Sequence, residues 1–386
     1  MTLDTIPDRG IKLSIYAPAS YSLFHRSPGP IGGAEINLYL IARTLARRNS
    51  YAVNCLVDDY GQAKTEAVQG VTLIRLTSSR ARGIAGFLSK RWRYLDFLLR
   101  DDSDVYLASS ASEFLIYLVA ISKFLKRKKV LFRVASENDL RDRLAPEYAA
   151  SKFHRWCRKS PLSLIYRWTL TRVDAIIVQS KDQWSLMRPR LRAKSVLIRN
   201  MALPGPENPR FENKTVMLWV GKAVPLKRPE MFLELARRVP EQNFLMILQG
   251  QNAFAREIGI RTKTIPNLRL LGRISFDKIY RYFVRAKCLV NTSIQEGFPN
   301  TFIQAGLFGC PLLSFRVNPD DIISRYQLGW VCRDSLEVAA DVLKNVLPLE
   351  LRARGENCRK YVLENHDLTK NSRLYDDLIR RICLSK

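Results

Sequence analysis

Short apolar runs alternate with stretches of helical periodicity along most of the chain. In the helical stretches apolar residues recur every three or four positions, whereas the apolar runs are bounded by polar, glycine or proline residues. This alternation is typical of a mostly parallel β-sheet flanked by helices, because parallel strands must be joined by crossover segments. The strands expected in the first half are residues 12–17, 53–57, 71–76, 105–108, 130–134 and 175–179. Those expected in the second half are residues 216–220, 244–248, 268–271, 288–292, 311–314 and 329–332.

The length of 386 residues allows two domains, each with its own hydrophobic core. Residues 204–213 include Pro204, Pro206 and Pro209 and show little helical pattern, so we expect a linker there. The expected fold class is α/β, with two doubly wound parallel-sheet domains. Ligands of such sheets bind beyond the carboxyl ends of the strands.

The segment 295–305 (QEGFPNTFIQA) follows a predicted strand and combines features of a ligand-binding turn. Pro299 has a preset φ and no N–H, which suits the first turn of a helix. Gly297 allows the backbone to approach a ligand without a Cβ in the way. The N–H groups of the helix start, Phe298 to Asn300, would face an anion, and Glu296 is a hydrogen-bond acceptor beside them. A carboxylate next to anion-binding N–H groups indicates a ligand that joins a phosphate to a polyol, such as a nucleotide-sugar.

Residues 296–305 resemble the signature of the retaining glycosyltransferases of family 4, in which two Glu residues are separated by seven residues within an E-G-F-P context. The resemblance implies that Glu296 contacts hydroxyls of the donor sugar and that the second position faces the ribose. This chain has Gln304 at the second position. An amide can still bind a ribose hydroxyl, but without charge assistance the bond should be weaker. The same segment is also compatible with an ordinary strand–turn–helix in which Glu296 is a solvated turn residue.

Two glycines after the first predicted strand match the same family. Gly32 and Gly33 stand between the strand at 12–17 and a helical pattern at 36–48. Paired glycines in such a place form a backbone loop that is able to approach a diphosphate. A Gly-Gly turn can also simply change the direction of the chain.

Two lysines follow the first strand of the second half. Lys222 and Lys227 lie in the loop between that strand and a helical pattern at 229–238. The resemblance implies that this basic pair binds the donor diphosphate, commonly as Arg then Lys. Here both are Lys, which is a less directional phosphate ligand than Arg, and two solvated surface lysines are the ordinary alternative. The resemblance also implies that Arg273, two strands further on, lines the nucleotide base.

The acceptor side is less well marked. Some relatives carry a histidine after the fifth strand, but here residues 133–139 read RVASEND, so that role is not carried over. Glu137 and Asp139 are the candidates to contact an acceptor hydroxyl. The three histidines show no metal-ligand spacing, and no Asp-x-Asp cluster stands in a matching loop. We therefore expect neither a metal nor another cofactor.

The resemblance extends from about residue 11 to about residue 331. It implies the GT-B arrangement, in which two Rossmann-like domains face a central cleft. Residues 196–200 resemble the strand that enters the hinge between them. The expected parts are an acceptor-side domain at 1–203, the linker at 204–213, a nucleotide-sugar-binding domain at 214–368, and a final helix at 369–386 that packs back on the first domain.

The formal net charge of +27 at pH 7 points to a polyanionic partner. Cations are mixed with bulky apolar residues at 87–100 (FLSKRWRYLDFLLR) and at 114–129 (FLIYLVAISKFLKRKK). Basic, aromatic-rich amphipathic helices suit the interface of an anionic membrane, although the apolar part of the second stretch is also what a core helix shows. Nucleic acid is the other polyanion. The chain shows no zinc spacing, helix-turn-helix or aromatic RNA-binding strand, so we favour the membrane and expect no nucleic-acid partner.

Two further features concern the cellular setting. No run approaches the ~20 apolar residues that span a bilayer, and the N-terminus lacks the pattern of a signal peptide. The seven cysteines are scattered, without a C-x-x-C pair, which favours reduced thiols. We expect a cytoplasmic protein that is peripheral on the inner face of a membrane.

Together with the resemblance to family 4, these features predict a metal-independent hexosyltransferase that uses a UDP- or GDP-sugar and a glycan or lipid-linked acceptor, in surface-polysaccharide or lipopolysaccharide assembly. Retention of configuration is what the resemblance implies. The expected catalytic residues are Glu296, Lys222 and Lys227. The expected donor-binding residues are Gly32, Gly33, Arg273, Gly297, Phe298, Pro299, Asn300 and Gln304. Two alternatives stay open: a non-catalytic GT-B partner subunit, which Gln304 favours, and a sugar-nucleotide epimerase.

Overall fold

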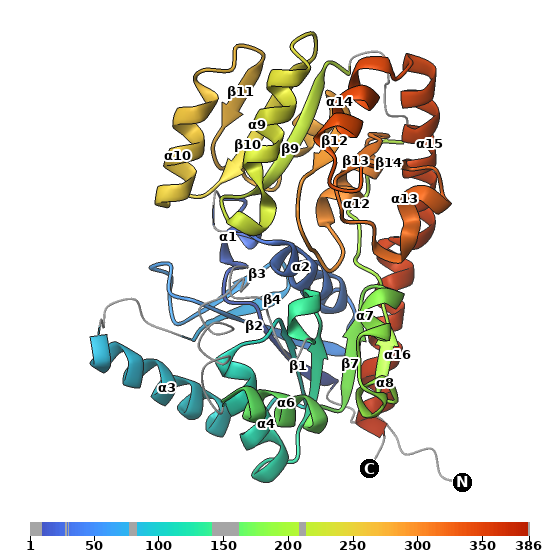
Figure 1. The fold of residues 1–386 in the computed structure, drawn as a ribbon. Helices are drawn as coiled ribbons and strands as arrows, with labels where there is room; N and C mark the ends of the chain where they lie inside the picture. The colour runs from blue at the N-terminus through green and yellow to red at the C-terminus, as the bar shows by residue number, and fades with distance from the viewer. Residues whose placement is uncertain are drawn as a thin grey trace. The chain divides into compact units, whose positions relative to one another are not determined.

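A computed structural model describes residues 10–27, 29, 31–76, 83–140, 162–207 and 214–384 (Figure 1). The chain forms two compact units, Met1–Ile198 with Thr369–Lys386, and Arg199–Leu368. The second part of the expected linker, from residue 208 to 213, lies outside the described residues.

The N-terminal unit contains a sheet with the strand order β3-β4-β2-β1-β5-β6-β7-β8. All neighbouring strands are parallel except the hairpin of β3 and β4. The bounds are β1 (Ile11–Tyr16), β2 (Tyr51–Val57), β3 (Thr65–Val68), β4 (Val71–Arg75), β5 (Val105–Ser109), β6 (Lys129–Arg133), β7 (Ala175–Val178) and β8 (Ser195–Leu197). The helices are α1 (Tyr21–Phe24), α2 (Gly33–Ala46), α3 (Gly83–Arg100), α4 (Glu113–Phe124), α6 (Leu162–Arg172), α7 (Lys181–Ser185), α8 (Pro189–Arg192) and α16 (Leu368–Leu384), with a 3-10 turn, η1 (Glu137–Asp139).

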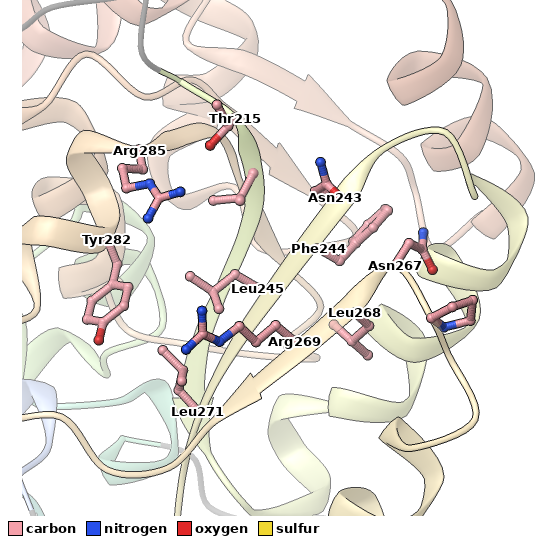
Figure 2. A pocket seen from close by; sticks show the side chains of 12 residues that line it. Thr215, Asn243, Phe244, Leu245, Asn267, Leu268, Arg269, Leu271, Tyr282 and Arg285 are labelled. Carbon is pink, nitrogen blue, oxygen red and sulfur yellow. The ribbon is translucent and has the colours of Figure 1, made fainter.

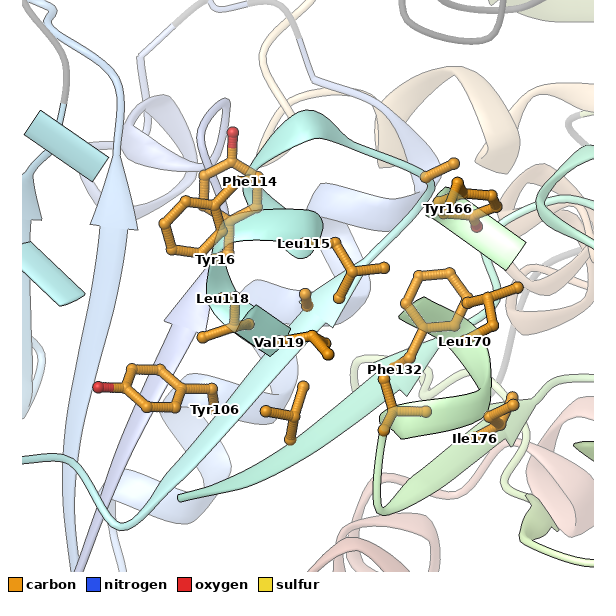
Figure 3. Close-up of a cluster of buried hydrophobic side chains, with 14 of the residues drawn as sticks. Tyr16, Tyr106, Phe114, Leu115, Leu118, Val119, Phe132, Tyr166, Leu170 and Ile176 are labelled. Atoms are coloured by element: carbon orange, nitrogen blue, oxygen red, sulfur yellow. The ribbon is translucent and has the colours of Figure 1, made fainter. Parts of the chain in front are cut away.

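One face of this sheet is covered by α3, α4 and α6. Side chains from all three helices share a single buried cluster with alternate residues of the strands, among them Tyr94, Phe114, Phe132, Tyr166 and Leu170. Figure 3 shows part of this cluster, with Phe114 stacked on Tyr16 at 4.2 Å between ring centroids. The three helices therefore form one layer, and the surface of that layer away from the sheet is common to them.

The final helix α16 belongs to the N-terminal unit. Its Asp376 accepts hydrogen bonds from Arg48 at 2.5 Å and from the Tyr51 hydroxyl at 2.6 Å. Arg380, one turn further, bonds both Asp376 at 2.7 Å and the Ser50 hydroxyl at 2.7 Å. The pKa of Asp376 lies below its ordinary value because these bonds outweigh the opposing effect of burial. A charged network thus attaches the end of the chain to the start of β2.

The C-terminal unit contains a parallel sheet with the strand order β11-β10-β9-β12-β13-β14. The strands are β9 (Val216–Lys222), β10 (Asn243–Gln249), β11 (Leu268–Leu271), β12 (Ala286–Asn291), β13 (Leu312–Ser314) and β14 (Gly329–Val331). The helices are α9 (Pro229–Arg238), α10 (Ala253–Thr262), α11 (Tyr280–Val284), α12 (Asn300–Leu307), α13 (Ile322–Arg325), α14 (Leu336–Asn345) and α15 (Pro348–Asn365), with 3-10 turns η3 (Pro225–Lys227) and η4 (Pro319–Asp321). Alternate residues of one strand belong to two different buried clusters, as for Met217 and Leu218 of β9, so both faces are covered.

The predicted fold class, two doubly wound parallel-sheet units, is confirmed. Every strand expected from the apolar runs is present, with ends shifted by at most two residues. The short strand β3 has no counterpart among those expectations, because its residues alternate between exposed and half-buried and carry no apolar run. The expected strand at 196–200 corresponds to β8, which begins and ends earlier.

Gly306 marks a close contact between α12 and α15. A Cβ at this position would lie 2.5 Å from Val362 Cγ2 and 2.9 Å from the Cys358 carbonyl oxygen. We therefore expect Gly306→Ala to lower the free energy of unfolding by about 1–3 kcal/mol, which urea titration would measure. Gly259→Ala in α10 is the control, because a Cβ there meets only Leu270 at 3.7 Å; it should be neutral or stabilise by up to about 1 kcal/mol. Equal stabilities of the two variants would contradict the tight packing.

Candidate functional site

The candidate site is built at the carboxyl ends of β9 and β12, which are neighbours in the C-terminal sheet. The loops that follow these strands are bonded to each other. Ile294 N–H donates to the Leu226 carbonyl at 3.0 Å, and the Thr292 hydroxyl donates to the Lys227 carbonyl at 2.6 Å. Arg228 has a left-handed backbone conformation with φ 42°, and its Nε donates a hydrogen bond to the Thr292 carbonyl at 2.7 Å. These bonds fix the backbone on which Lys227 and Glu296 stand.

Lys227 and Glu296 form an ion pair. Lys227 Nζ lies 2.7 Å from Glu296 Oε2, and the two side chains are 23% and 15% exposed. The other carboxylate oxygen accepts from Asn291 Nδ2 at 2.9 Å and from the Ser293 hydroxyl at 2.8 Å. Glu296 is therefore a fixed, mostly buried carboxylate, and the interpretation of it as a solvated turn residue is wrong.

The ionisation of Glu296 follows from these contacts. Burial raises the pKa of the carboxyl, but the charge of Lys227 and the hydrogen bonds from Lys227, Asn291 and Ser293 lower it by more. The pKa of Glu296 consequently lies below its ordinary value, and the group is a carboxylate at neutral pH. Such a carboxylate accepts hydrogen bonds from sugar hydroxyls without first losing a proton.

Helix α12 begins beside this pair. Pro299 is its N-cap residue, with φ −64° and ψ 120°, and Asn300 is its first residue, so the proline stands one position earlier than expected. No side chain of the cap residue bonds the helix start. The opening turn of an α-helix has backbone N–H groups without intrahelical partners, which favours an anion at this end. Phe298 is buried and anchors the turn in the core cluster on that face of the sheet.

The other donor-side candidates of the C-terminal unit lie at the same edge of this sheet. Lys222 is the exposed last residue of β9, and Gln304 is half-buried one turn into α12, on the same side as Asn300. Gly297 is buried in the turn before the helix. Arg273 is exposed and follows β11, which is two strands away from β9. Lys227 and Glu296 are thus in direct contact, whereas Arg273 lies at the same edge of the sheet but two strands away from β9.

Gly32 and Gly33 lie in the N-terminal unit, after β1 and at the start of α2. Gly32 is the N-cap residue, with φ −119° and ψ 174°, and Gly33 is the exposed first helical residue. Any residue adopts this extended backbone, so the conformation does not require glycine at position 32. What the pair provides is a helix start without side chains over its N–H groups.

The two acceptor candidates differ in their surroundings. Asp139 is buried, and its two oxygens accept from three backbone N–H groups, those of Ala111 at 2.9 Å, Ala135 at 2.8 Å and Ser136 at 3.0 Å. These bonds link the loops that follow β5 and β6, so Asp139 stabilises the fold at this point. Glu137 is half-buried in the same turn, so it is the better placed of the two for an acceptor.

Sequence reasoning missed the residues that hold the site. Asn291 and Ser293 bond Glu296, and Asn200 contacts the start of α12. Polar residues at the end of an apolar strand are a usable signal for the first two. Asn200 is distant in sequence, and no local pattern connects it with α12.

The same unit has a hollow of about 610 Å³. Figure 2 shows the side chains that line it. Several of its lining residues stand at or next to the beginnings of strands: Thr215 before β9, Asn243 in β10 and Asn267 before β11. It is therefore centred toward the amino ends of the strands, away from the ion pair of Lys227 and Glu296. Because ligands of such sheets bind beyond the carboxyl ends, this hollow is not the candidate donor site.

Two searches of the described residues bear on cofactors and membranes. Within them, no group of three or more His, Cys, Asp or Glu side chains is arranged to hold a metal ion. Among the helices that the structure describes, none has the length and apolar character needed to cross a bilayer.

The C-terminal unit matches a known family. Residues 214–347 match the sequence model of the family described as glycosyl transferases group 1. The matched range contains the sheet from β9 to β14 and both Lys227 and Glu296. A sequence comparison with curated proteins finds no significant match.

Solved structures share the fold of the whole chain. Sucrose-phosphate synthase from Thermosynechococcus elongatus superposes with a TM-score of 0.76 at 14% identity, covering 97% of this chain and 100% of the other. HepE of Anabaena, in complex with UDP-glucose, gives a TM-score of 0.70 at 13% identity, covering 96% and 100%. WaaG, a glycosyltransferase involved in lipopolysaccharide biosynthesis, gives 0.65 at 15% identity, covering 97% and 100%. At these identities the likeness shows the fold, which is GT-B.

Proposed function

We propose that the protein is a retaining glycosyltransferase that moves a hexose from a nucleoside-diphosphate sugar to a hydroxyl of a glycan or lipid-linked acceptor. The observation that carries the proposal is the ion pair of Lys227 and Glu296, both partly buried, beside the start of α12. An anion-binding helix start and a cation suit the diphosphate, and a fixed carboxylate suits the sugar hydroxyls. The family match of residues 214–347 and the UDP-glucose bound by HepE support the same ligand class.

The residues act on two parts of the donor. In the reaction, the bond between the sugar and the diphosphate breaks, and a bond to the acceptor oxygen forms as the acceptor hydroxyl loses its proton. Lys222, Lys227 and the start of α12 would neutralise the charge that develops on the leaving diphosphate. An ammonium has three N–H donors, so Lys227 can bond a phosphate oxygen and keep Glu296. Glu296 would hold the sugar so that its anomeric carbon faces the acceptor.

These cations would serve in place of a divalent metal, so we expect transfer to continue without one. Retention of configuration is proposed from the resemblance of residues 296–305 to family 4. The acceptor would belong to a surface polysaccharide or a lipopolysaccharide, as the membrane-facing features below suggest.

A non-catalytic partner subunit is the second candidate function. The observation in its favour is Gln304, which stands where the resemblance leads one to expect a glutamate. Assays with purified protein, membrane extract and labelled UDP- and GDP-hexoses decide between the two. Transfer of label to an extractable glycan supports the enzyme, and binding of the donor without any turnover supports the partner subunit. Conversion of the free donor to its epimer would support a sugar-nucleotide epimerase instead.

Gln304 provides a test of the donor orientation. If its amide faces the ribose, Gln304→Ala should weaken donor binding by about 1 kcal/mol, the net contribution of one hydrogen bond. Gln304→Glu should keep or improve the affinity, because a carboxylate forms a stronger, charge-assisted bond. Calorimetric titration with UDP and GDP gives the three affinities. Equal values for all three proteins would show that this side chain points away from the nucleotide.

We further propose that the protein docks on an anionic membrane through the outer surface of the helix layer formed by α3, α4 and α6. Trp92 of α3 is 70% exposed, and Phe124 at the end of α4 is 63% exposed and stacks on the exposed Trp168 of α6. The other exposed apolar side chains of the layer are Leu88, Leu99, Leu125, Leu164 and Ile165. Exposed aromatic and aliphatic side chains beside cations are suited to the boundary between headgroups and acyl chains.

The basic residues of this layer are not equivalent. Arg91 forms an ion pair with Glu113 at 2.5 Å and is only 17% exposed, so it is unsuited to contact lipid. Arg93, Arg127 and Arg172 are exposed, and Arg172 lies over the Trp168 ring at 5.4 Å. These three are the cations that we expect to face the membrane.

A variant with Arg93, Arg127 and Arg172 all changed to Gln tests this surface. Each cation near an anionic bilayer contributes about 1 kcal/mol, so affinity for phosphatidylglycerol-containing vesicles should fall by roughly a hundredfold. The control changes three exposed cations of the C-terminal unit, Arg256, Lys263 and Lys278, to Gln, and removes the same charge. Co-sedimentation at low and high salt measures both. Equal losses, or retention of RNA rather than vesicles, would contradict the membrane surface.

A further inference from the structure

The chain passes between the two units after Ile198 and again after Leu368. Residues next to both crossings meet inside the C-terminal unit. His366, which is fully buried, places Nδ1 2.7 Å from the Asn200 carbonyl oxygen, and its own carbonyl accepts the Ala202 N–H at 2.8 Å. A carbonyl oxygen can only accept, so Nδ1 carries the proton of this bond. The segment from Asn200 to Ala202 is thereby held against the end of α15.

Asn200 extends this connection to the start of α12. Its side chain is buried, and Nδ2 lies 3.3 Å from the Phe298 carbonyl oxygen and 3.1 Å from Asn300 Oδ1. The Phe298 ring also packs on the His366 ring, with 4.8 Å between centroids. Two different kinds of contact, one polar and one aromatic, therefore reach the residues that begin α12.

We propose that Asn200 and His366 are positioning residues that hold the start of α12 in the orientation that binds the donor diphosphate. The need for such residues follows from the helix itself, since Pro299 offers no polar side chain to cap it. Backbone N–H groups contribute most to binding an anion when their direction is set beforehand. Here Asn200 fixes both the carbonyl before the cap and the side chain of the first helical residue. The inference rests on the proposed function, because that function assigns the diphosphate to α12.

Two isosteric substitutions separate the hydrogen bond from the bulk of the side chain. His366→Asn places an amide N–H near the position of Nδ1 and should keep the bond to the Asn200 carbonyl. His366→Gln places its amide near the position of Nε2 and should lose that bond. We expect His366→Gln to weaken the binding of UDP or GDP, whichever binds the unmodified protein more tightly, by roughly 5- to 10-fold, the effect of about one hydrogen bond. His366→Asn should stay within about twofold of the unmodified protein.

Asn200→Asp provides a second variant in case His366→Gln does not fold. It is close in shape, but it replaces the Nδ2 donor by an acceptor that faces Asn300 Oδ1 and the Phe298 carbonyl. Asn365→Ala is the matched control, because Asn365 is next to His366 and its amide bonds the Tyr361 carbonyl at 3.0 Å, within α15. Asn200→Asp should weaken nucleotide binding at least as much as His366→Gln, and the control should not change it.

Hydrogen exchange in the absence of nucleotide is the second measurement. Amides of residues 298–303 should exchange faster in His366→Gln and Asn200→Asp than in His366→Asn or Asn365→Ala. If both exchange and affinity match those of the controls, the positioning role is wrong, while the proposed function stands. If the unmodified protein binds neither UDP nor GDP, the proposed transfer from a UDP- or GDP-sugar is wrong, and the exchange result still decides whether these residues order α12. Faster exchange with unchanged affinity would also overturn the inference, because the ordering would then have no effect on the ligand.

Discussion

The protein with Glu296→Gln is expected to transfer hexose with a kcat/KM that is about 10²- to 10³-fold lower, the usual effect of removing one preorganised polar contact at a reacting group. The substitution keeps the size of the side chain and an oxygen to accept from Asn291 or Ser293. It removes the charge that holds Lys227 Nζ at 2.7 Å. The substitution should therefore weaken the binding of the sugar hydroxyls and change the orientation of the Lys227 ammonium. Initial rates with the preferred donor and membrane extract measure the loss.

Lys227→Met completes a double-mutant cycle. Because the two side chains are in contact, the double variant should be less impaired than the two single losses predict. Lys287→Met is the control: this half-buried lysine of β12 has a single described bond, to Gln242 Oε1 at 3.0 Å, and its loss should change the rate by less than twofold. Turnover at the unmodified rate in both Glu296→Gln and Lys227→Met would show that the reaction takes place elsewhere.

Most of the strands could be predicted because they are apolar runs that are largely buried. Strands of a sheet covered on both faces show no alternation, so segments such as β10 and β12 stand out as continuous hydrophobic stretches. The hairpin strand β3 pairs antiparallel with β4 and has only half-buried and exposed residues. Its stability comes from that pairing, which no local pattern records.

The candidate site could be predicted only where one loop contains all the information. The turn from Glu296 to Asn300 carries its own signals, and the structure finds it at a helix start, with Pro299 displaced by one position. The contact of Lys227 with Glu296 depends on β9 lying next to β12, although β10 and β11 come between them in the chain. A strand order of this kind is a property of the tertiary fold.

The position of Asp139 likewise depends in part on contacts that the sequence does not reveal. From the sequence, Asp139 is a candidate, with Glu137, to contact an acceptor hydroxyl. In the structure its carboxylate is buried and accepts from the backbone of Ala111, which precedes α4, as well as from Ala135 and Ser136. A carboxylate that bonds three N–H groups has little capacity left for a ligand. The bonds from Ala135 and Ser136 are local, and the one from Ser136 belongs to a capping box, whereas the bond from Ala111 comes from a loop that is distant in sequence.

His366 leads to the second large effect, a pH dependence of stability. Burial, together with the nearby charge of Arg199, lowers the pKa of His366 to about 3 from its ordinary value of 6.5, although the bond to the Asn200 carbonyl opposes the shift. Among the described residues, Nε2 is buried and has no hydrogen-bond partner. A proton on Nε2 would therefore place a charge in the core without an acceptor.

The sign of the effect follows from the direction of this shift. Between pH 6.5 and about 3 the unfolded chain binds a proton at His366 that the folded protein does not, so stability falls as the pH is lowered through this range. The full contribution, present above pH 6.5, is up to about 5 kcal/mol. His366→Asn has no group that titrates there, so the difference in unfolding free energy between it and the unmodified protein should change steadily over this window. Carboxylates with lowered pKa values, such as Glu296 and Asp376, affect both proteins alike and cancel in the difference. Urea titrations at pH 7, 6, 5 and 4 give this difference, and a constant value from pH 7 to pH 4 would contradict a neutral, buried His366.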